Sequence, residues 1–163
     1  MATHQENKKK RFLRFKRRLR NFIKLTWRIK LLLLGSLWLM GIVRLAILIL
    51  PFRYLTKFMG KKMAESPSQI NPKLLSRAVT VGWCVNILSN FTPWESKCLV
   101  RAFTAHIILQ MLKIPSTLYF GMAKTDSNKL LAHAWLRCGD FMITGDRERE
   151  GFKSVAQFAT LTE

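Results

Sequence analysis

The longest apolar segment of the chain covers residues 31–52 and is bounded by Lys30 and Arg53. Its length matches the roughly 20 apolar residues that cross a bilayer core, and it predicts a hydrophobic helix within residues 31–60. Arg44 lies near the middle, where a charge costs roughly 2.5 to 3.5 kcal/mol on insertion scales. Three arrangements fit this pattern: a helix in the membrane interface, a helix that spans the bilayer, and a helix packed on the folded domain.

The pattern changes after this segment. Residues 61–71 carry turn-forming Ser66, Pro67 and Ser68, and they are predicted to form a linker. We therefore expect the folded domain to cover residues 72–163. Its first element is a helix over residues 73–90, where apolar side chains recur at helical spacing.

A second helix is predicted over residues 98–113, because apolar residues follow one another on neighbouring turns until Pro115 ends the pattern. Three short strands follow, separated by turn-forming residues. They cover residues 117–123, 130–138 and 141–145. A helix followed by an antiparallel meander predicts an α+β fold.

The charge of the chain is strongly asymmetric. Residues 1–30 form a basic arm with twelve Lys and Arg residues and one acidic residue, Glu6, and the net charge of the whole chain is +19. Aromatic residues are interleaved with these cations, as at Phe12, Phe15 and Trp27. This combination suits an anionic membrane surface or single-stranded nucleic acid.

The chain has three cysteines, an odd number that cannot all pair within it. We expect reduced thiols and a cytoplasmic protein, at the cytoplasmic face of the membrane if the apolar helix lies in the interface. Cys84 falls on the apolar face of the first predicted helix, where a cysteine is usually a packing residue.

Cys98 stands in the first turn of the second predicted helix. The free N–H groups and partial positive charge of a helix N-terminus favour a thiolate. The same N–H groups can hold the oxyanion of a tetrahedral intermediate. By its spacing alone, however, Cys98 could equally be a small core residue.

His133 makes the catalytic interpretation of Cys98 stronger. If Gly139 and Asp140 form the two-residue turn of a hairpin, Trp135 faces Thr144 and His133 faces Asp146. Opposed side chains on antiparallel strands lie close enough for a carboxylate to hold an imidazole N–H. This geometry favours a Cys98, His133 and Asp146 triad, with Asp140 as the alternative acid.

The other polar residues suggest simpler roles. His106 lies in the middle of the second helix, so we expect it to pack rather than to react. Arg101 could bind a substrate carboxylate or form a surface ion pair. The cysteines and histidines lack the paired short spacings of a metal site, and no glycine-rich phosphate loop is present. We therefore expect neither a metal nor a cofactor.

Several motifs resemble those of the lasso-peptide maturation peptidases, bacterial transglutaminase-like proteins of the microcin-processing type. The similar residues are Pro93-Trp94-x-x-x-Cys98-Leu99-x-Arg101-Ala102, Ile114-Pro115, Tyr119-Phe120-Gly121-Met122 and Ala132-His133-Ala134-Trp135. The resemblance covers roughly residues 72–160 and extends weakly toward residue 30.

This resemblance implies a transglutaminase-like, papain-like cysteine peptidase core that removes the leader from a lasso precursor peptide. In that family the triad corresponds to Cys98, His133 and Asp146. The resemblance also implies a small leader-binding partner protein supplied in trans, and a separate ATP-dependent lasso cyclase that acts on the product.

Two other functions remain open from the sequence. A transglutaminase-like acyltransferase shares the first half-reaction and differs only in passing the acyl group to an amine. A non-enzymatic module that binds membrane or nucleic acid would explain the basic arm. For the catalytic protein itself we expect no nucleic-acid partner, and a Cys98→Ala variant that kept full biological activity would favour the binding module.

Overall fold

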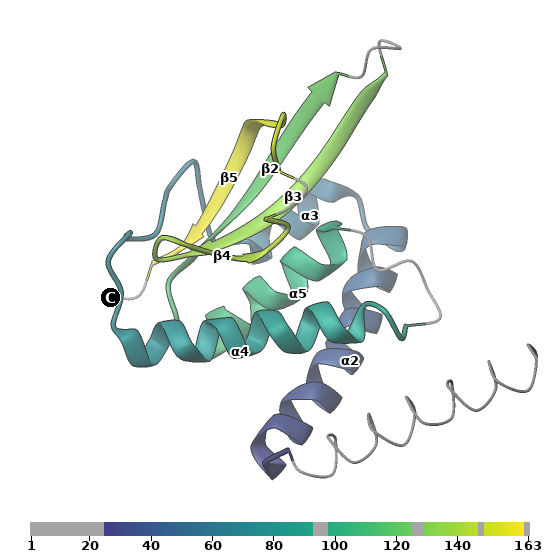
Figure 1. Ribbon diagram of the computed structural model, residues 1–163. Helices are drawn as coiled ribbons and strands as arrows, with labels where there is room; N and C mark the ends of the chain where they lie inside the picture. Colours follow the sequence, from purple (N-terminus) through teal and green to yellow (C-terminus); the bar gives the residue numbers. More distant parts are fainter. Residues whose placement is uncertain (1–24, 93–97, 125–128, 147–148, 162–163) are drawn as a thin grey trace, which may run out of the picture. The chain divides into compact units, whose positions relative to one another are not determined.

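The computed structural model describes residues 25–92, 98–124, 129–146 and 149–161. The chain divides into two compact units, Met1–Leu32 and Leu33–Glu163. The second unit has the predicted α+β fold, with helices and one antiparallel sheet (Figure 1). Most of the predicted basic arm, residues 1–30, lies outside the described residues.

The described residues contain four helices and one short helical turn besides the sheet. They are α2 (Trp27–Ile49), α3 (Phe52–Leu55), the 3-10 turn η1 (Thr56–Phe58), α4 (Pro72–Leu88) and α5 (Cys98–Met111). The predicted apolar helix is confirmed as α2, and the two later helices as α4 and α5. Asn71 caps α4, because its side chain accepts a hydrogen bond from the Lys73 backbone N–H at 2.9 Å, and Pro72 fills the first helical position.

The sheet has five strands in the order β1-β5-β2-β3-β4, and every neighbouring pair is antiparallel. The strands are β1 (Lys61–Lys62), β2 (Ser116–Lys124), β3 (Leu130–Cys138), β4 (Phe141–Thr144) and β5 (Lys153–Thr160). The three predicted strands are confirmed as β2, β3 and β4. Strands β1 and β5 were not predicted from the sequence. The connection from β4 to β5 passes from one side of the β2–β3 pair to the other.

Helix α5 packs against β2, β3 and β4 on one face of the sheet. The paired residues Leu118, Leu136 and Phe158 form the core on this face. His106 of α5 is fully buried; its Nδ1 lies 3.0 Å from the Ser116 hydroxyl and its Nε2 lies 2.8 Å from the Met59 carbonyl oxygen. His106 is therefore a packed, hydrogen-bonded residue, as predicted.

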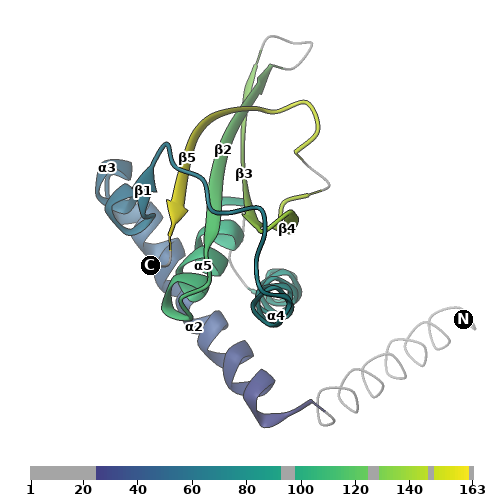
Figure 2. The ribbon, with the colours of Figure 1, turned by 90° about the vertical axis from the view of Figure 1, so that its left-hand side faces the viewer.

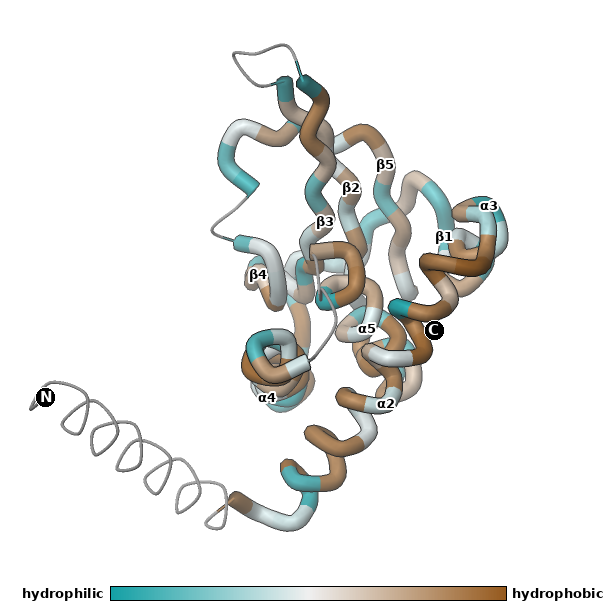
Figure 3. Tube along the Cα trace, turned by 90° about the vertical axis from the view of Figure 1, so that its right-hand side faces the viewer, coloured by the Kyte–Doolittle hydropathy of each residue, from teal (hydrophilic) through white to brown (hydrophobic). Residues whose placement is uncertain are grey.

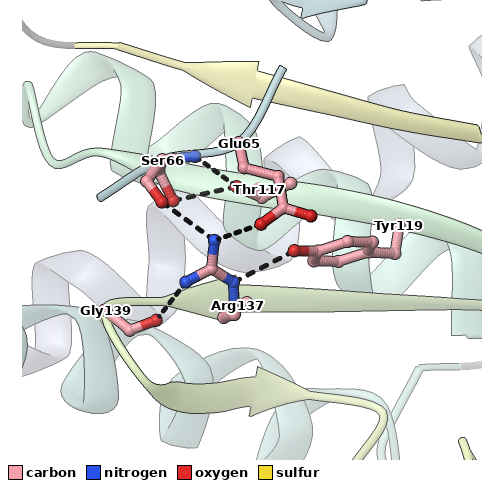
Figure 4. Close-up of polar contacts among 6 residues, drawn as sticks. All are labelled: Glu65, Ser66, Thr117, Tyr119, Arg137 and Gly139. Atoms are coloured by element: carbon pink, nitrogen blue, oxygen red, sulfur yellow. Dashed lines mark hydrogen bonds and ion pairs between the residues drawn. The ribbon is translucent and has the colours of Figure 1, made fainter. Parts of the chain in front are cut away.

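The opposite face of the sheet carries Tyr119 and Trp135, whose rings stack with centroids 5.5 Å apart. Beside them, Arg137 donates hydrogen bonds to the Tyr119 hydroxyl at 3.1 Å, the Ser66 carbonyl at 2.8 Å and the Gly139 carbonyl at 2.7 Å (Figure 4). The Ser66 backbone N–H donates to the Thr117 hydroxyl at 2.8 Å. Arg137 thus connects the segment that precedes α4 with strands β2 and β3.

The structure differs here from the predicted linker at residues 61–71 and from a domain that begins near Pro72. Lys61 and Lys62 pair with β5, and the chain then crosses the sheet toward α4 (Figure 2). Ser66 is buried within this crossing. Turn-forming residues are common in flexible linkers. In this protein, however, the segment crosses the sheet in one defined path and forms hydrogen bonds with β2 and β3.

Candidate active site

Cys98 is the first residue of α5, in the first helical turn as predicted, and its side chain is half-buried. The N-terminal end of α5 lies beside β3 in both views (Figures 1 and 2). A helix N-terminus offers backbone N–H groups that no residue of the same helix accepts. The thiol therefore lies where developing negative charge can be stabilised. Residues 93–97, which complete the predicted motif, lie outside the described residues.

His133 lies on β3 and is 6% exposed. Its Nε2 lies 3.2 Å from the carbonyl oxygen of Gly145. A carbonyl only accepts hydrogen bonds, so this contact places the ring proton on Nε2 in the neutral histidine. In this tautomer Nδ1 is the nitrogen that can accept a proton from a thiol.

Two aromatic rings fix the orientation of the His133 ring. Trp135 stacks on it with centroids 5.9 Å apart and an angle of 19° between the planes. Phe152, in the connection between β4 and β5, contacts it with centroids 5.2 Å apart. Packing and the hydrogen bond to Gly145 thus hold the imidazole, which is how a general base is kept in place before its substrate binds.

Cys98 and His133 approach the same strand from different sides. The side chain of His133 leaves β3 on the Trp135 face, whereas α5 covers the face that carries Leu136. Strand β4 pairs only with residues 136–138, so among the described residues the outer edge of β3 from 130 to 135 has no partner strand. For the two side chains to meet, they must therefore reach each other around this open edge of β3.

The predicted register of the β3–β4 hairpin is only partly correct. Cys138 pairs with Phe141 as predicted, but Thr144 pairs with Leu136 and not with Trp135. The ladder ends there, so the predicted pairing of His133 with Asp146 is not formed. The register shifts because a bulge in β4 lets two successive residues, Ile143 and Thr144, be buried together.

A contact between distant parts of the chain explains this bulge. A Cβ atom placed on Gly82 of α4 would lie 2.6 Å from both Cγ2 and the carbonyl oxygen of Ile143. The absence of a side chain at Gly82 therefore lets α4 approach the β4 backbone closely. Asn86 of the same helix donates to the Ile143 carbonyl at 3.4 Å.

Asp146 is exposed and its carboxylate accepts a hydrogen bond from Arg149 at 3.1 Å. The hydrogen-bond acceptor on His133 Nε2 is instead the backbone carbonyl of the preceding residue, Gly145. Asp140 lies in the turn at the other end of β3, and the five residue-to-residue steps from His133 to Cys138 alone span about 16 Å. The structure therefore favours Asp146 over Asp140 as the acid nearer to His133.

Gly145 and Phe152 belong to the site but were not identified from the sequence. Gly145 has φ +80°, and a Cβ atom there would lie 3.0 Å from His133 Nε2 and 2.8 Å from the Trp135 Cβ. Only glycine fits this position without displacing the base. Its sequence signal was the Gly145-Asp146 pair after a strand, which marks a turn; nothing in the sequence pointed to Phe152.

The thiols of the other two cysteines are expected to be unreactive. Cys84 and Cys138 are fully buried, and burial raises the pKa of each thiol to about 11. Among the described residues, His, Cys, Asp and Glu side chains form no group of three that could hold a metal ion. Arg101 is half-buried on the first turns of α5, where both roles considered for it stay open.

A model of the transglutaminase-like superfamily matches residues 43–157 of the chain. The match begins within α2, covers both later helices and ends within β5, so it includes Cys98 and His133. No curated protein and no solved structure matches significantly.

Proposed function

Because this chain belongs to the transglutaminase-like superfamily, which includes cysteine peptidases and acyltransferases, we propose that it is a cysteine peptidase that removes the leader from a lasso precursor peptide. The observation that carries the proposal is the site itself. A half-buried cysteine begins a helix whose N-terminal end lies beside the strand that carries a sequestered, oriented histidine. The choice of a lasso precursor rests on the sequence motifs around Cys98 and His133.

In the proposed reaction, Nδ1 of His133 takes the proton from Cys98 and the thiolate attacks the scissile carbonyl of the precursor. The carbonyl oxygen becomes negatively charged, and backbone N–H groups at the start of α5 stabilise it. His133 returns the proton to the leaving amine, which is the new N-terminus of the core peptide. Water then hydrolyses the thioester, so the leader departs with a free carboxylate and Cys98 regains its proton.

Asp146 has a supporting role in this proposal. When His133 becomes an imidazolium, its Nε2–H carries positive charge that a neutral carbonyl stabilises less well than a carboxylate does. Asp146 follows Gly145 directly, and its carboxylate forms an exposed ion pair with Arg149. Such a pair is weak, so we propose that the carboxylate moves to His133 during the reaction.

The wider setting is also part of the proposal. We propose that a small leader-binding protein presents the precursor in trans, and that a lasso cyclase closes the ring of the released core peptide. We place these steps in the cytoplasm, which the three free cysteines support because reduced thiols persist there.

Co-expression with a lasso precursor and its leader-binding protein tests the proposal. The size of the precursor is followed by mass spectrometry for the wild type, Cys98→Ala, His133→Ala and Asp146→Asn. We expect leader removal by the wild type, none by Cys98→Ala or His133→Ala, and reduced removal by Asp146→Asn. Undiminished removal by Cys98→Ala would exclude the cysteine mechanism.

The same experiment separates hydrolysis from acyl transfer. A peptidase leaves a leader that ends in a free carboxylate, so its mass contains one added water. An acyltransferase would join the leader to an amine. If purified protein with precursor and a primary amine yields only the amide product, the acyltransferase replaces the peptidase as the proposed function.

A further inference from the structure

Within the second unit, the part of α2 from Leu33 to Ile49 has two different faces. Leu33, Ser36, Met40 and Val43 are buried in the domain and recur every three or four residues. On the opposite side of the helix, at 100° per residue, lies a row of exposed apolar side chains. This outer face consists of Leu34, Trp38, Ile42, Leu45 and Ile49, which are 55% to 71% exposed. Most of α2 is coloured as hydrophobic in Figure 3.

Arg44, the charge that interrupts the apolar segment, does not lie on the outer face. At 100° per residue it lies about 120° from the centre of that face and closer to the buried side, and it is half-buried. The outer face is therefore uncharged along its whole length. Monomeric soluble proteins rarely expose apolar rows of this size without a partner.

Aromatic and basic residues extend this surface beyond the end of α2. Phe52, Tyr54 and Phe58 of α3 and η1 are 48%, 41% and 65% exposed. Arg53 lies over the Tyr54 ring at 4.9 Å and Lys57 lies 5.6 Å from its centre. Ile42 of the outer face and Phe58 line the same hollow, so the two parts are continuous. Aromatic rings beside cations are typical of residues at the boundary between lipid tails and head groups.

The positive charge of the surrounding sequence indicates which kind of partner fits this apolar surface. Residues 7–64 contain seventeen Lys and Arg residues and no Asp or Glu. Arg53, Lys57, Lys61 and Lys62 of this stretch lie in the second unit, next to the apolar surface in the sequence. An apolar face flanked only by positive charge is complementary to a bilayer with anionic head groups.

We infer that the second unit docks on an anionic membrane surface through the outer face of α2 together with α3 and η1, and that α2 lies in the interface. By length and composition α2 could also span a bilayer. Spanning, however, would remove Leu33, Met40 and Val43 from the domain and would place Ser36 and Arg44 in the bilayer core. Lying in the interface leaves these contacts in place. This inference is independent of the proposed peptidase activity.

Vesicle co-sedimentation of the full chain tests the inference. The vesicles contain phosphatidylcholine with or without phosphatidylglycerol, at low and at high salt. We expect binding to the anionic vesicles at low salt and much weaker binding at high salt or to neutral vesicles. Bound protein should also be released by an alkaline carbonate wash, because α2 lies in the interface and does not cross the bilayer.

Matched variants identify the surface. Trp38→Ser with Leu45→Ser should weaken binding at least tenfold. Leu130→Ser with Val155→Ser, which replaces apolar residues of the sheet that are more than half exposed, should change it less than twofold. Arg53→Gln with Lys57→Gln should weaken binding about fivefold for each charge removed. Lys73→Gln with Arg77→Gln, exposed cations of α4, provide the control. Thermal unfolding verifies that every variant is folded.

Three results would overturn the inference. Absence of binding to anionic vesicles at low salt would exclude a membrane partner. Equal binding by the outer-face variant and its control would show that the basic N-terminal residues act without α2. Protein that resists the carbonate wash, together with stronger quenching of Trp38 by deeply than by shallowly brominated lipid, would show a spanning helix. The Trp38 signal is obtained by subtracting the spectrum of Trp38→Phe.

Discussion

The most informative residue of the site is Gly145, because it acts on His133 in two ways. Its carbonyl oxygen accepts the hydrogen bond that places the ring proton on Nε2, and its missing side chain leaves room for the ring. Trp135 was detectable from the sequence, since it lies two residues after His133 and so shares its face of a strand. The contact with Gly145 depends on a bulge in β4, which the sequence does not reveal.

A Gly145→Ala variant tests this positioning. The new Cβ would lie 3.0 Å from His133 Nε2, and φ +80° is unfavourable for alanine by about 1–2 kcal/mol. Gly151→Ala is the matched control, because Gly151 has φ +86° with nothing within 4 Å of its added Cβ. We expect both variants to lose similar stability in denaturant unfolding, but only Gly145→Ala to slow leader removal at least tenfold. Equal activities would mean that Gly145 does not position the base.

The three cysteines should differ in reactivity. Cys84 and Cys138 are fully buried, and a pKa of about 11 in place of 9 leaves about a hundredfold less thiolate near neutral pH. Iodoacetamide should therefore modify native protein only at Cys98, as peptide mass mapping would show. Native Cys98→Ala should remain unmodified until it is unfolded. Rapid labelling of Cys84 or Cys138 in native protein would contradict the described packing.

His106 should make stability depend on pH. Burial lowers its pKa from 6.5 to about 4 in the folded protein, against the opposing effect of its hydrogen bond to Met59. The unfolded chain therefore binds the proton first as the pH falls, and stability that is full above pH 6.5 is lost toward pH 4. Between pH 7 and pH 5 we expect a loss of about 2 kcal/mol from this residue. In urea unfolding, the free energy of unfolding of His106→Gln should fall by correspondingly less over this pH range. An identical fall in the variant and the wild type would contradict this role of His106.

At the scale of elements, the sequence predicted what local patterns determine. Both later helices and the β2, β3 and β4 strands have clear periodicity, and the cysteine was correctly expected at a helix start. Strand β1 was undetectable because it consists of two exposed lysines at a sheet edge. Strand β5 was missed because only Phe158 and Ala159 of its eight residues are fully buried. The predicted register of the β3–β4 hairpin was wrong beyond Arg137 for a non-local reason, the close approach of Gly82 to Ile143.

Arg137 joins elements that are far apart in the sequence. Its side chain is 12% exposed and donates to the Ser66 and Gly139 carbonyls. An Arg137→Met variant leaves both acceptors without this donor, so we expect a loss of about 2–4 kcal/mol in urea unfolding. Arg149→Met removes an exposed pair and should cost less than about 1 kcal/mol. Comparable losses in the two variants would show that the crossing segment is held by other contacts.

At the scale of the whole molecule, the sequence predicted the α+β class but placed the start of the domain too late. The compact unit begins at Leu33 and the superfamily match begins at residue 43, both within α2. The apolar segment appeared separable because its composition differs from the rest of the chain. Only the structure shows that one stripe of it, through Met40 and Val43, belongs to the core.

The most direct test of the central claim is a time course with purified protein, lasso precursor and leader-binding protein, quenched in acid and measured by intact-protein mass spectrometry. We predict that the wild type releases the leader and that any transient adduct has the mass of the leader acyl group and maps to Cys98. Cys98→Ala should show neither release nor adduct. Release of the leader by Cys98→Ala at the wild-type rate would contradict the account, because the chemistry would then not pass through this thiol.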